Sequence, residues 1–500
     1  MAIIAPTGAT GKNAFGVAST WGSEVASTDL LVDMWMTMKE ASLNLNYPKG
    51  AGSMYKRSAN PMENKADVNI KGPLAITQLE KLLKAFHGQH YRSSAVETTA
   101  YKHSYWLKDT PTDMLTFAQH GGQGTVAVKI IDTAVLNTMK ISGKDGDTPL
   151  EIEFAGIGRR IKRAPAITSL VNTPTSINAL TAPGVDAYEK KVTMIHGSTA
   201  TGLNAGYFKV RRVGTFATST AVVTSPGGGN ATRGAVTFPT ATAMAFVPPE
   251  TITVTFTAAT TFTVAGSVGG AYGSGSTGVA FAAAFPATFL GTYAGSPSPT
   301  AFTVTITAGG SPMAAGDTIV WVHEYNSTGT DTAFGSPNTF YPTSIDFFVD
   351  KKMIGVPSGD RYVAHPVTNE QREIKLKFAA PSYEGLSNDV PDLGVVYALW
   401  RDMQYQQAGT IFYYKLDCYF EFPQLAGSTT QKYYLRLTIP RAALRVPDWQ
   451  MSGPGLLPVN LEFEVQQPFT VPSDFSGFAN STTDLYPYGL EICNKLSTDT

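Results

Sequence analysis

The sequence predicts a mainly β protein with short helices, and three observations support this. Charged residues make up 15% of the 500-residue chain, whereas ordinary soluble domains contain roughly 25%. Much of the polar character comes from Thr, Ser, Gly and Asn, and β-branched residues suit a pleated, half-buried surface. Many segments alternate apolar and polar residues, which is the period of a strand. The same order of strands and one helix also occurs twice along the chain.

The first set of elements follows an N-terminal arm, residues 1–42, which has no helical stripe of apolar residues. Residues 66–72 alternate as a half-buried strand does. Residues 74–86 repeat apolar side chains three and four apart, so they predict a helix that Gly88 ends. Further strands are expected at 114–119, 125–131, 135–143 and 150–154.

The second set of elements lies near the C-terminus. It begins with a strand at 373–378 and a helical stretch at 393–403, and strands follow at 409–422, 433–439, 443–451 and 459–465. Three pairs of segments align: Lys71 with Lys377 at an offset of 306, Val135–Leu136 with Ala443–Leu444 at 308, and Glu151–Phe154 with Asn460–Phe463 at 309. A nearly constant offset is typical of a duplicated unit. Two unrelated α+β domains that share common elements are the alternative.

Between the two sets lies a segment with almost no charge. From Val213 to Gly316 only Arg233 and Glu250 are charged. Residues 251–256, 302–306 and 318–322 alternate cleanly and are separated by turn residues, which predicts an inserted, sandwich-like antiparallel β module. A flexible low-complexity linker is the alternative, but disordered segments are poor in aromatic and β-branched residues.

These patterns divide the chain into six parts. The parts are an N-terminal arm at 1–42, a first unit at 43–165, a connector at 166–205, an inserted β module at 206–335, a second unit at 343–470 and a C-terminal arm at 471–500.

Charge and cysteine content exclude several classes of protein. The net charge is -1 and the pI about 6.7, so the chain as a whole lacks the basic surface of a nucleic-acid-binding protein. Cys418 and Cys493 cannot build a disulfide framework and are expected to be free thiols in a reducing cytoplasm. No segment resembles a signal peptide or a membrane span. We therefore expect synthesis in a cytoplasm.

No segment carries a convincing catalytic motif. Thr7–Lys12 resembles a phosphate-binding loop, but Pro6 and Asn13 stand where the motif needs Gly and Ser or Thr. His87 and His90 are expected to be a capping or surface pair, because two ligands do not make a zinc site. We therefore predict no enzyme activity, no catalytic residue, no cofactor and no metal site. A carbohydrate-active or peptidase domain on a β scaffold is the enzymatic alternative.

Four stretches together resemble one known protein family. They are Phe15–Gly22, Asp67–Gly72 with the helix Leu79–Gly88, Tyr101–Tyr105, and Leu136–Gly143 with Leu150–Gly156. They resemble the opening, the strand–helix core and the closing half of the major tail tube proteins of long-tailed (siphovirus-like) bacteriophages. The resemblance covers residues 14–158 directly and 344–469 through the repeat, and it does not cover the insert.

The resemblance implies a structural virion protein with two tandem tail-tube-like β-sandwich or barrel units. In that family six units close a ring, and stacked rings form the hollow tail tube that conducts DNA to the host. Two units per chain then imply three chains per ring, with pseudo-sixfold symmetry. The implied partners are copies of the chain itself, the tape measure, tail terminator and distal tail proteins, and DNA in transit without specific binding. A tail-tip protein, an adhesin or a capsid decoration protein is the alternative.

Two groups of residues are candidates for contacts within such a tube. The alternating closing strands place carboxylates on one face, so Glu151, Glu153, Glu462 and Glu464 are expected to face the lumen and repel phosphate. The compact basic run Arg159, Arg160, Lys162 and Arg163 is a candidate contact with a neighbouring subunit. Exposure to solvent outside the tube is the alternative for both groups. The insert is expected on the outer surface, where it would block neither the bore nor the stacking faces.

Overall fold

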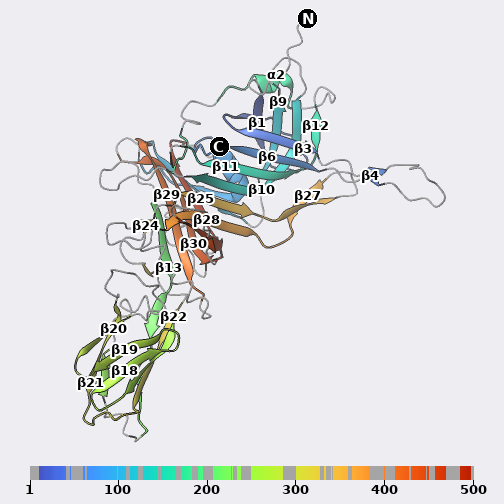
Figure 1. The fold of residues 1–500 in the computed structure, drawn as a ribbon. Helices are drawn as coiled ribbons and strands as arrows, with labels where there is room; N and C mark the ends of the chain where they lie inside the picture. The colour runs from blue at the N-terminus through green and yellow to red at the C-terminus, as the bar shows by residue number, and fades with distance from the viewer. Residues whose placement is uncertain are drawn as a thin grey trace, which may run out of the picture.

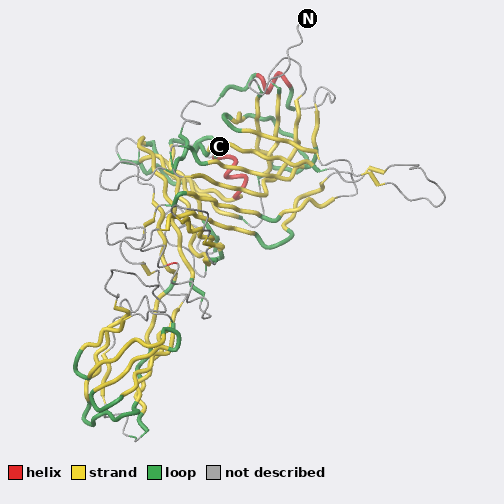
Figure 2. Tube along the Cα trace, in the orientation of Figure 1, coloured by secondary structure: helices red, strands yellow, loops and turns green. Residues whose placement is uncertain are grey.

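The computed structural model shows a mainly β protein with two short helices among the described residues (Figure 1, Figure 2). This confirms the predicted fold class. The described residues are chiefly 11–40, 65–97, 99–108, 113–121, 128–144, 148–163, 171–182, 190–194, 207–226, 249–284, 300–326, 342–357, 363–382, 411–426, 430–445, 457–468 and 485–496, with a few shorter pieces between them.

One antiparallel sheet, here called the long sheet, runs through both halves of the chain. In spatial order its strands are β3 (Trp35–Glu40), β6 (Ala66–Pro73), β11 (Glu151–Gly158), β10 (Val128–Lys144), β25 (Ser344–Asp350), β28 (Glu373–Ser382), β32 (Leu457–Val465) and β31 (Asp448–Trp449). The pairing of β10 with β25 joins the two halves, because β10 belongs to the first and β25 to the second.

A second layer of strands covers one face of the long sheet. In the first half this layer is β2 (Asp29–Leu31), β1 (Lys12–Ala18), β9 (Met114–His120), the start of β10, and β12 (Ile161–Arg163). In the second half it is β13 (Tyr207–Val213), β29 (Tyr413–Leu425), β30 (Lys432–Leu444), β33 (Gly489–Asn494), β8 (Tyr101–Leu107) and β7 (Gly88–Arg92). The short strands β23 (Thr332–Ala333) and β24 (Thr339–Phe340) pair with the other edge of β13.

A common hydrophobic core lies between the two layers. It contains side chains from the covered face of the long sheet, among them Ile70, Phe154 and Phe463, and side chains of the second layer, such as Phe15 and Leu416. Strands β10 and β30 contribute to both layers, because each pairs with different neighbours at its two ends.

Helix α1 (Glu80–His87) packs into this core beside β8 and β10. Its buried residues include Leu82, Leu83 and Phe86, as the apolar spacing predicts, and Gly88 ends it in the left-handed conformation with φ 76°. The helix starts six residues later than expected from the sequence. The predicted helix at 393–403 lies, apart from residue 399, outside the described residues. Helix α2 (Pro174–Asn178) lies against β9.

The low-charge segment folds into a two-layer β-sandwich that projects from the rest of the molecule as a separate lobe (Figure 1). One layer contains β14 (Thr215–Thr218), β22 (Thr318–Asn326), β17 (Glu250–Phe256), β18 (Thr261–Gly266) and β19 (Gly270–Ser276), with β15 (Val222–Thr224) beside β22. The other contains β16 (Gly234–Thr237), β21 (Thr300–Ala308) and β20 (Ala280–Ala284). Its own core includes Phe256, Phe302 and Trp321.

Two hairpins lie outside these layers. The hairpin of β26 (Met353–Pro357) and β27 (Val363–Thr368) connects β25 to β28 and reaches the first half, where the indole of Trp21 donates a hydrogen bond to the Val363 carbonyl. The short pair β4 (Leu45–Asn46) and β5 (Asn60–Pro61) lies between β3 and β6 in the chain.

Strand pairing runs in the same order in both halves. By their neighbours, β1 corresponds to β13, β3 to β25, β6 to β28, β9 to β29, β10 to β30, β11 to β32, and β12 to β33. The registers also correspond: Lys71 lies opposite Trp35 and Glu153, and Lys377 lies opposite Asp346 and Glu462.

The structure corrects the expected domain boundaries in three places. The described part of the expected N-terminal arm forms β1, β2 and β3, and β1 pairs along its whole length with β9. Strand β13, assigned to the insert from the sequence, belongs to the second half because it pairs with β29. Strand β33, assigned to a C-terminal arm, lies between β30 and β8.

Candidate assembly surface

The uncovered face of the long sheet, here called the polar face, carries two rows of charged side chains across the strands. One row holds Trp35, Lys71, Glu153, Lys140, Phe348, Lys375 and Glu464. The next holds Glu151, Ser142, Asp346, Lys377 and Glu462, and Arg445 follows it, with its backbone N–H bonded to the Glu462 carbonyl. Alternate residues of a strand point to opposite faces, so these rows lie opposite the core.

The structure brings the four glutamates predicted from the sequence onto this one face. Glu151 forms an ion pair of 2.9 Å with Lys71, and Glu462 forms one of 2.9 Å with Lys377. Glu464 accepts two bonds from the Arg445 guanidinium, at 2.8 and 3.0 Å. Glu153 accepts a 2.5 Å hydrogen bond from the Asn69 amide.

The expectation of an acidic face needs correction, because cations pair with three of the four glutamates. The closing strands β11 and β32 present only acidic or neutral side chains there, but the strands beside them supply cations. Lys140 also pairs with Asp346 at 2.9 Å, so ion pairs cross the junction between the halves. The result is a face of alternating charge, on which a carboxylate repels phosphate no more than its neighbouring lysine attracts it.

These pairings favour the charged forms of the side chains involved. The hydrogen bond that Lys71 donates to Glu151 raises the pKa of Lys71, and those that Arg445 donates to Glu464 raise the pKa of Arg445. Hydrogen bonds from Lys352 and Lys375 lower the pKa of Glu373, at the edge of the same face, to about 2. The charges of the polar face therefore neutralise one another within the chain.

The long sheet ends in strands that have an unpaired edge among the described residues. Strand β3 pairs only with β6, and β31 pairs only with β32. On β3, Trp35 is 76% exposed on the polar face. Unpaired strand edges are sites for pairing with another chain, and aromatic residues are enriched in protein interfaces.

The basic run after β11 contacts residues of its own chain. The Asp132 carboxylate, which is fully buried, lies 2.7 Å from Arg160, 3.4 Å from Arg159 and 3.7 Å from Lys162. Lys162 also lies 3.0 Å from Glu24. Only the Arg163 side chain, 66% exposed and 3.9 Å from Glu40, extends mainly into solvent. Three of the four residues thus have a structural role that the sequence did not indicate.

The histidines lie differently from the sequence interpretation. His87 is buried, with Nδ1 2.7 Å from the Leu83 carbonyl and Nε2 3.0 Å from the Tyr488 hydroxyl, so it is not a surface residue. His90 lies on β7, not on the helix, and contacts His103 on β8. Sequence spacing could not reveal this contact, because the β7–β8 hairpin creates it. Cys418 and Cys493 are free and buried, as expected.

Comparison of the sequence with protein-family models and with curated proteins gives no match. Within the part of the chain that the structure describes, neither helix has the length and apolar character needed to cross a membrane.

Proposed function

We propose that the chain is a structural subunit of a hollow, stacked-ring tube, the major tail tube protein of a long-tailed bacteriophage virion. The observation that carries the proposal is the long sheet: one continuous antiparallel sheet, covered on one face, ion-paired on the other, and ending in unpaired strands. Such a sheet is a segment of a larger barrel, because closure is what removes unpaired edges.

We further propose that the two halves are tandem copies of one unit. The matching order and register of seven strands in each half support this. Leu136 lies opposite Gly156 in the first half, and the corresponding pair in the second half is Ala442 opposite Val465. Strand pairing therefore matches Leu136 with Ala442, two residues before Leu444, with which the sequence pattern aligned it. Beyond the bulge after Leu136 in β10, the pairing matches Thr138 with Ala443, so the offset changes from 306 to 305.

Three chains would close the ring if the family's six units are kept. With eight strand positions per chain, β3 of one copy would pair with β31 of the next. Strands lie ~4.8 Å apart, so a barrel of about 24 strands has a diameter of roughly 37 Å before the strand tilt widens it. A bore of that size accommodates a DNA duplex. A cyclic arrangement repeats the same contact at each junction.

The charge pattern of the polar face suits a conduit. The opposite face is covered by the core, so a barrel made from this sheet would line its bore with the polar face. Phosphate binding gains free energy when cations replace the counterions of DNA. Lysines already held by carboxylates contribute less to that gain, so DNA could pass without being retained.

Electron microscopy of the purified full-length protein, combined with native mass measurement, tests the proposal. We expect rings or tubes built from three chains per ring, with the polar face inside. A protein that stays monomeric at high concentration, or rings with the polar face outside, would contradict it. An adhesin or a capsid decoration protein would instead show no tube.

A further inference from the structure

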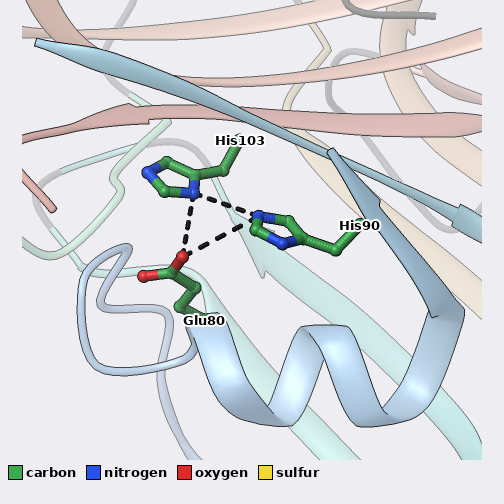
Figure 3. Close-up of side chains that lie close together, drawn as sticks. All are labelled: Glu80, His90 and His103. Carbon is green, nitrogen blue, oxygen red and sulfur yellow. Dashed lines mark hydrogen bonds and ion pairs between the residues drawn. The ribbon is translucent and has the colours of Figure 1, made fainter. Parts of the chain in front are cut away.

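Figure 3 shows three side chains from separate elements whose polar atoms face one another: Glu80, His90 and His103. Glu80 is the first residue of α1, His90 lies on β7 and His103 lies on β8. In the β7–β8 pair, His90 lies opposite Tyr105 and His103 lies opposite Arg92, so both histidines point to the same face of the hairpin.

The three atoms are spaced as metal ligands are. Nδ1 of His103 lies 2.8 Å from Oε1 of Glu80 and 3.1 Å from Nε2 of His90, and the third separation is 3.8 Å. Two nitrogens and an oxygen each about 2.0–2.1 Å from a tetrahedral ion lie about 3.3 Å apart. The observed separations lie on both sides of that value.

The environment of the cluster favours a cation over direct contact. All three side chains are at least 95% buried, and neither carboxylate oxygen of Glu80 accepts a hydrogen bond from a described group. A buried carboxylate is costly unless a cation or hydrogen bonds compensate its charge, and the two histidines beside Glu80 are cations only if they are protonated. An ion bound by all three atoms would supply that compensation.

The second nitrogen of His103 fixes the tautomer that a metal needs. Nε2 lies 3.1 Å from the Leu496 carbonyl oxygen, which can only accept, so Nε2 carries the proton. In the neutral ring Nδ1 then has a lone pair directed toward Glu80 and His90, and it lies within hydrogen-bond distance of Nε2 of His90. Histidines that bind metals usually donate their other N–H in this way.

We propose that Glu80, His90 and His103 form a binding site for one divalent transition-metal ion, with Zn²⁺ the best match to two imidazole nitrogens and one carboxylate oxygen. The fourth position is left for water or another small ligand. The ion would join α1 to the β7–β8 hairpin and, through Leu496, to the segment after β33. This inference is independent of the proposed tube function.

Zinc titration of the untagged, chelator-treated full-length protein tests the site. We expect one Zn²⁺ per chain by mass spectrometry and calorimetry, a higher unfolding temperature with zinc than with chelator, and a visible absorption band when Co²⁺ replaces zinc. Glu80→Gln and His90→Gln should lower the zinc affinity by at least about tenfold, since even neighbours of ligands have effects of that size. His365→Gln is the matched control, because His365 is exposed and outside the cluster.

Each outcome decides the proposal. If folded wild-type protein binds no zinc and shows no cobalt band, the cluster is an imidazolium–carboxylate pair and the proposal is wrong. It is also wrong if the Glu80 and His90 variants bind zinc as tightly as the His365 variant. If those variants do not fold, the wild-type cobalt spectrum decides, because a band requires protein ligands and its absence overturns the site.

Discussion

At the residue scale, the buried ionisable groups have structural explanations that the sequence alone could not supply. Lys351 is 3% exposed, and its ammonium nitrogen lies 4.3 Å from the centre of the Phe86 ring. Burial lowers its pKa to about 7, and burial lowers the pKa of His87 to about 3. Both residues pack around the end of α1, so the protonation of this part of the core affects stability.

Lys351 makes stability depend on pH above neutrality. Its pKa is about 7 in the folded protein, against 10.5 for a lysine in the unfolded chain, so the unfolded chain binds more protons between these values. The free energy of unfolding therefore rises with pH across that window. We expect Lys351→Met to remove this rise and to stabilise the protein at pH 7. Denaturant unfolding of both proteins at several pH values measures this dependence. If the free energy of unfolding of the variant rises with pH as steeply as that of the wild type, Lys351 is not its cause.

His87 makes stability depend on pH in the acidic range. The folded protein keeps the ring neutral down to about pH 3, whereas the unfolded chain takes up a proton near pH 6.5. The neutral His87 ring therefore makes its full contribution to the free energy of unfolding above pH 6.5, and this contribution decreases as the pH falls toward 3. We expect His87→Gln to flatten the decrease between pH 6.5 and 4 in thermal unfolding curves. An equally steep decrease in the variant would show that other groups dominate.

The Asp132 carboxylate should stabilise the fold at the end of β11, because it neutralises the positive charges of the basic run. We expect Asp132→Asn to destabilise the protein by about 3 kcal/mol, since removing one partner of a buried ion pair leaves the other charges uncompensated. Arg163→Gln is the control: that side chain is mostly exposed, so its loss should change the free energy of unfolding by less than about 0.5 kcal/mol. Similar effects of the two variants would contradict this structural role.

At the element scale, the sequence predicted the regular strands best. Residues 66–72 alternate cleanly and form β6, and the strand expected at 114–119 forms β9. Strand β1 was missed because it contains small residues, and its structure depends on pairing with β9, a hundred residues later. The sequence correctly predicted that the glutamates share one face of the sheet. It could not predict their pairing with lysines, because these lie on neighbouring strands and only the order of strands in the sheet brings them together. The cluster of Glu80, His90 and His103 depends on tertiary contacts in the same way.

The insert should fold on its own and be dispensable for assembly. Its core is separate from that of the two halves. We expect replacement of residues 214–331 by a short Gly/Ser linker to leave the rest folded and able to form tubes, because the insert projects as a lobe (Figure 1) and Arg212 pairs with Thr332 at its base. Circular dichroism and electron microscopy check both points. Loss of tubes by a correctly folded variant would show that the insert takes part in assembly.

At the scale of the whole molecule, Trp35 tests closure of the ring. Because this side chain is exposed at an unpaired edge, Trp35→Ala should hardly change the stability of the monomer but should raise the concentration needed for assembly at least about fivefold, as losing a central interface aromatic commonly costs more than ~1 kcal/mol. Sedimentation velocity measures this. Val222→Ala, exposed on the insert, is the control. Equal assembly of both variants would place the contact elsewhere.

The position of β33 has a consequence for how the protein is made. The strand lies between β30 and β8, so β8 obtains this neighbour only after a segment almost four hundred residues later, Gly489–Asn494, has been synthesised. Until then β8 lacks its partner on one side, and pairings between segments so far apart in the sequence form slowly. A chain truncated before Gly489 would lack the strand between β30 and β8. We expect that such products stay out of the assembly.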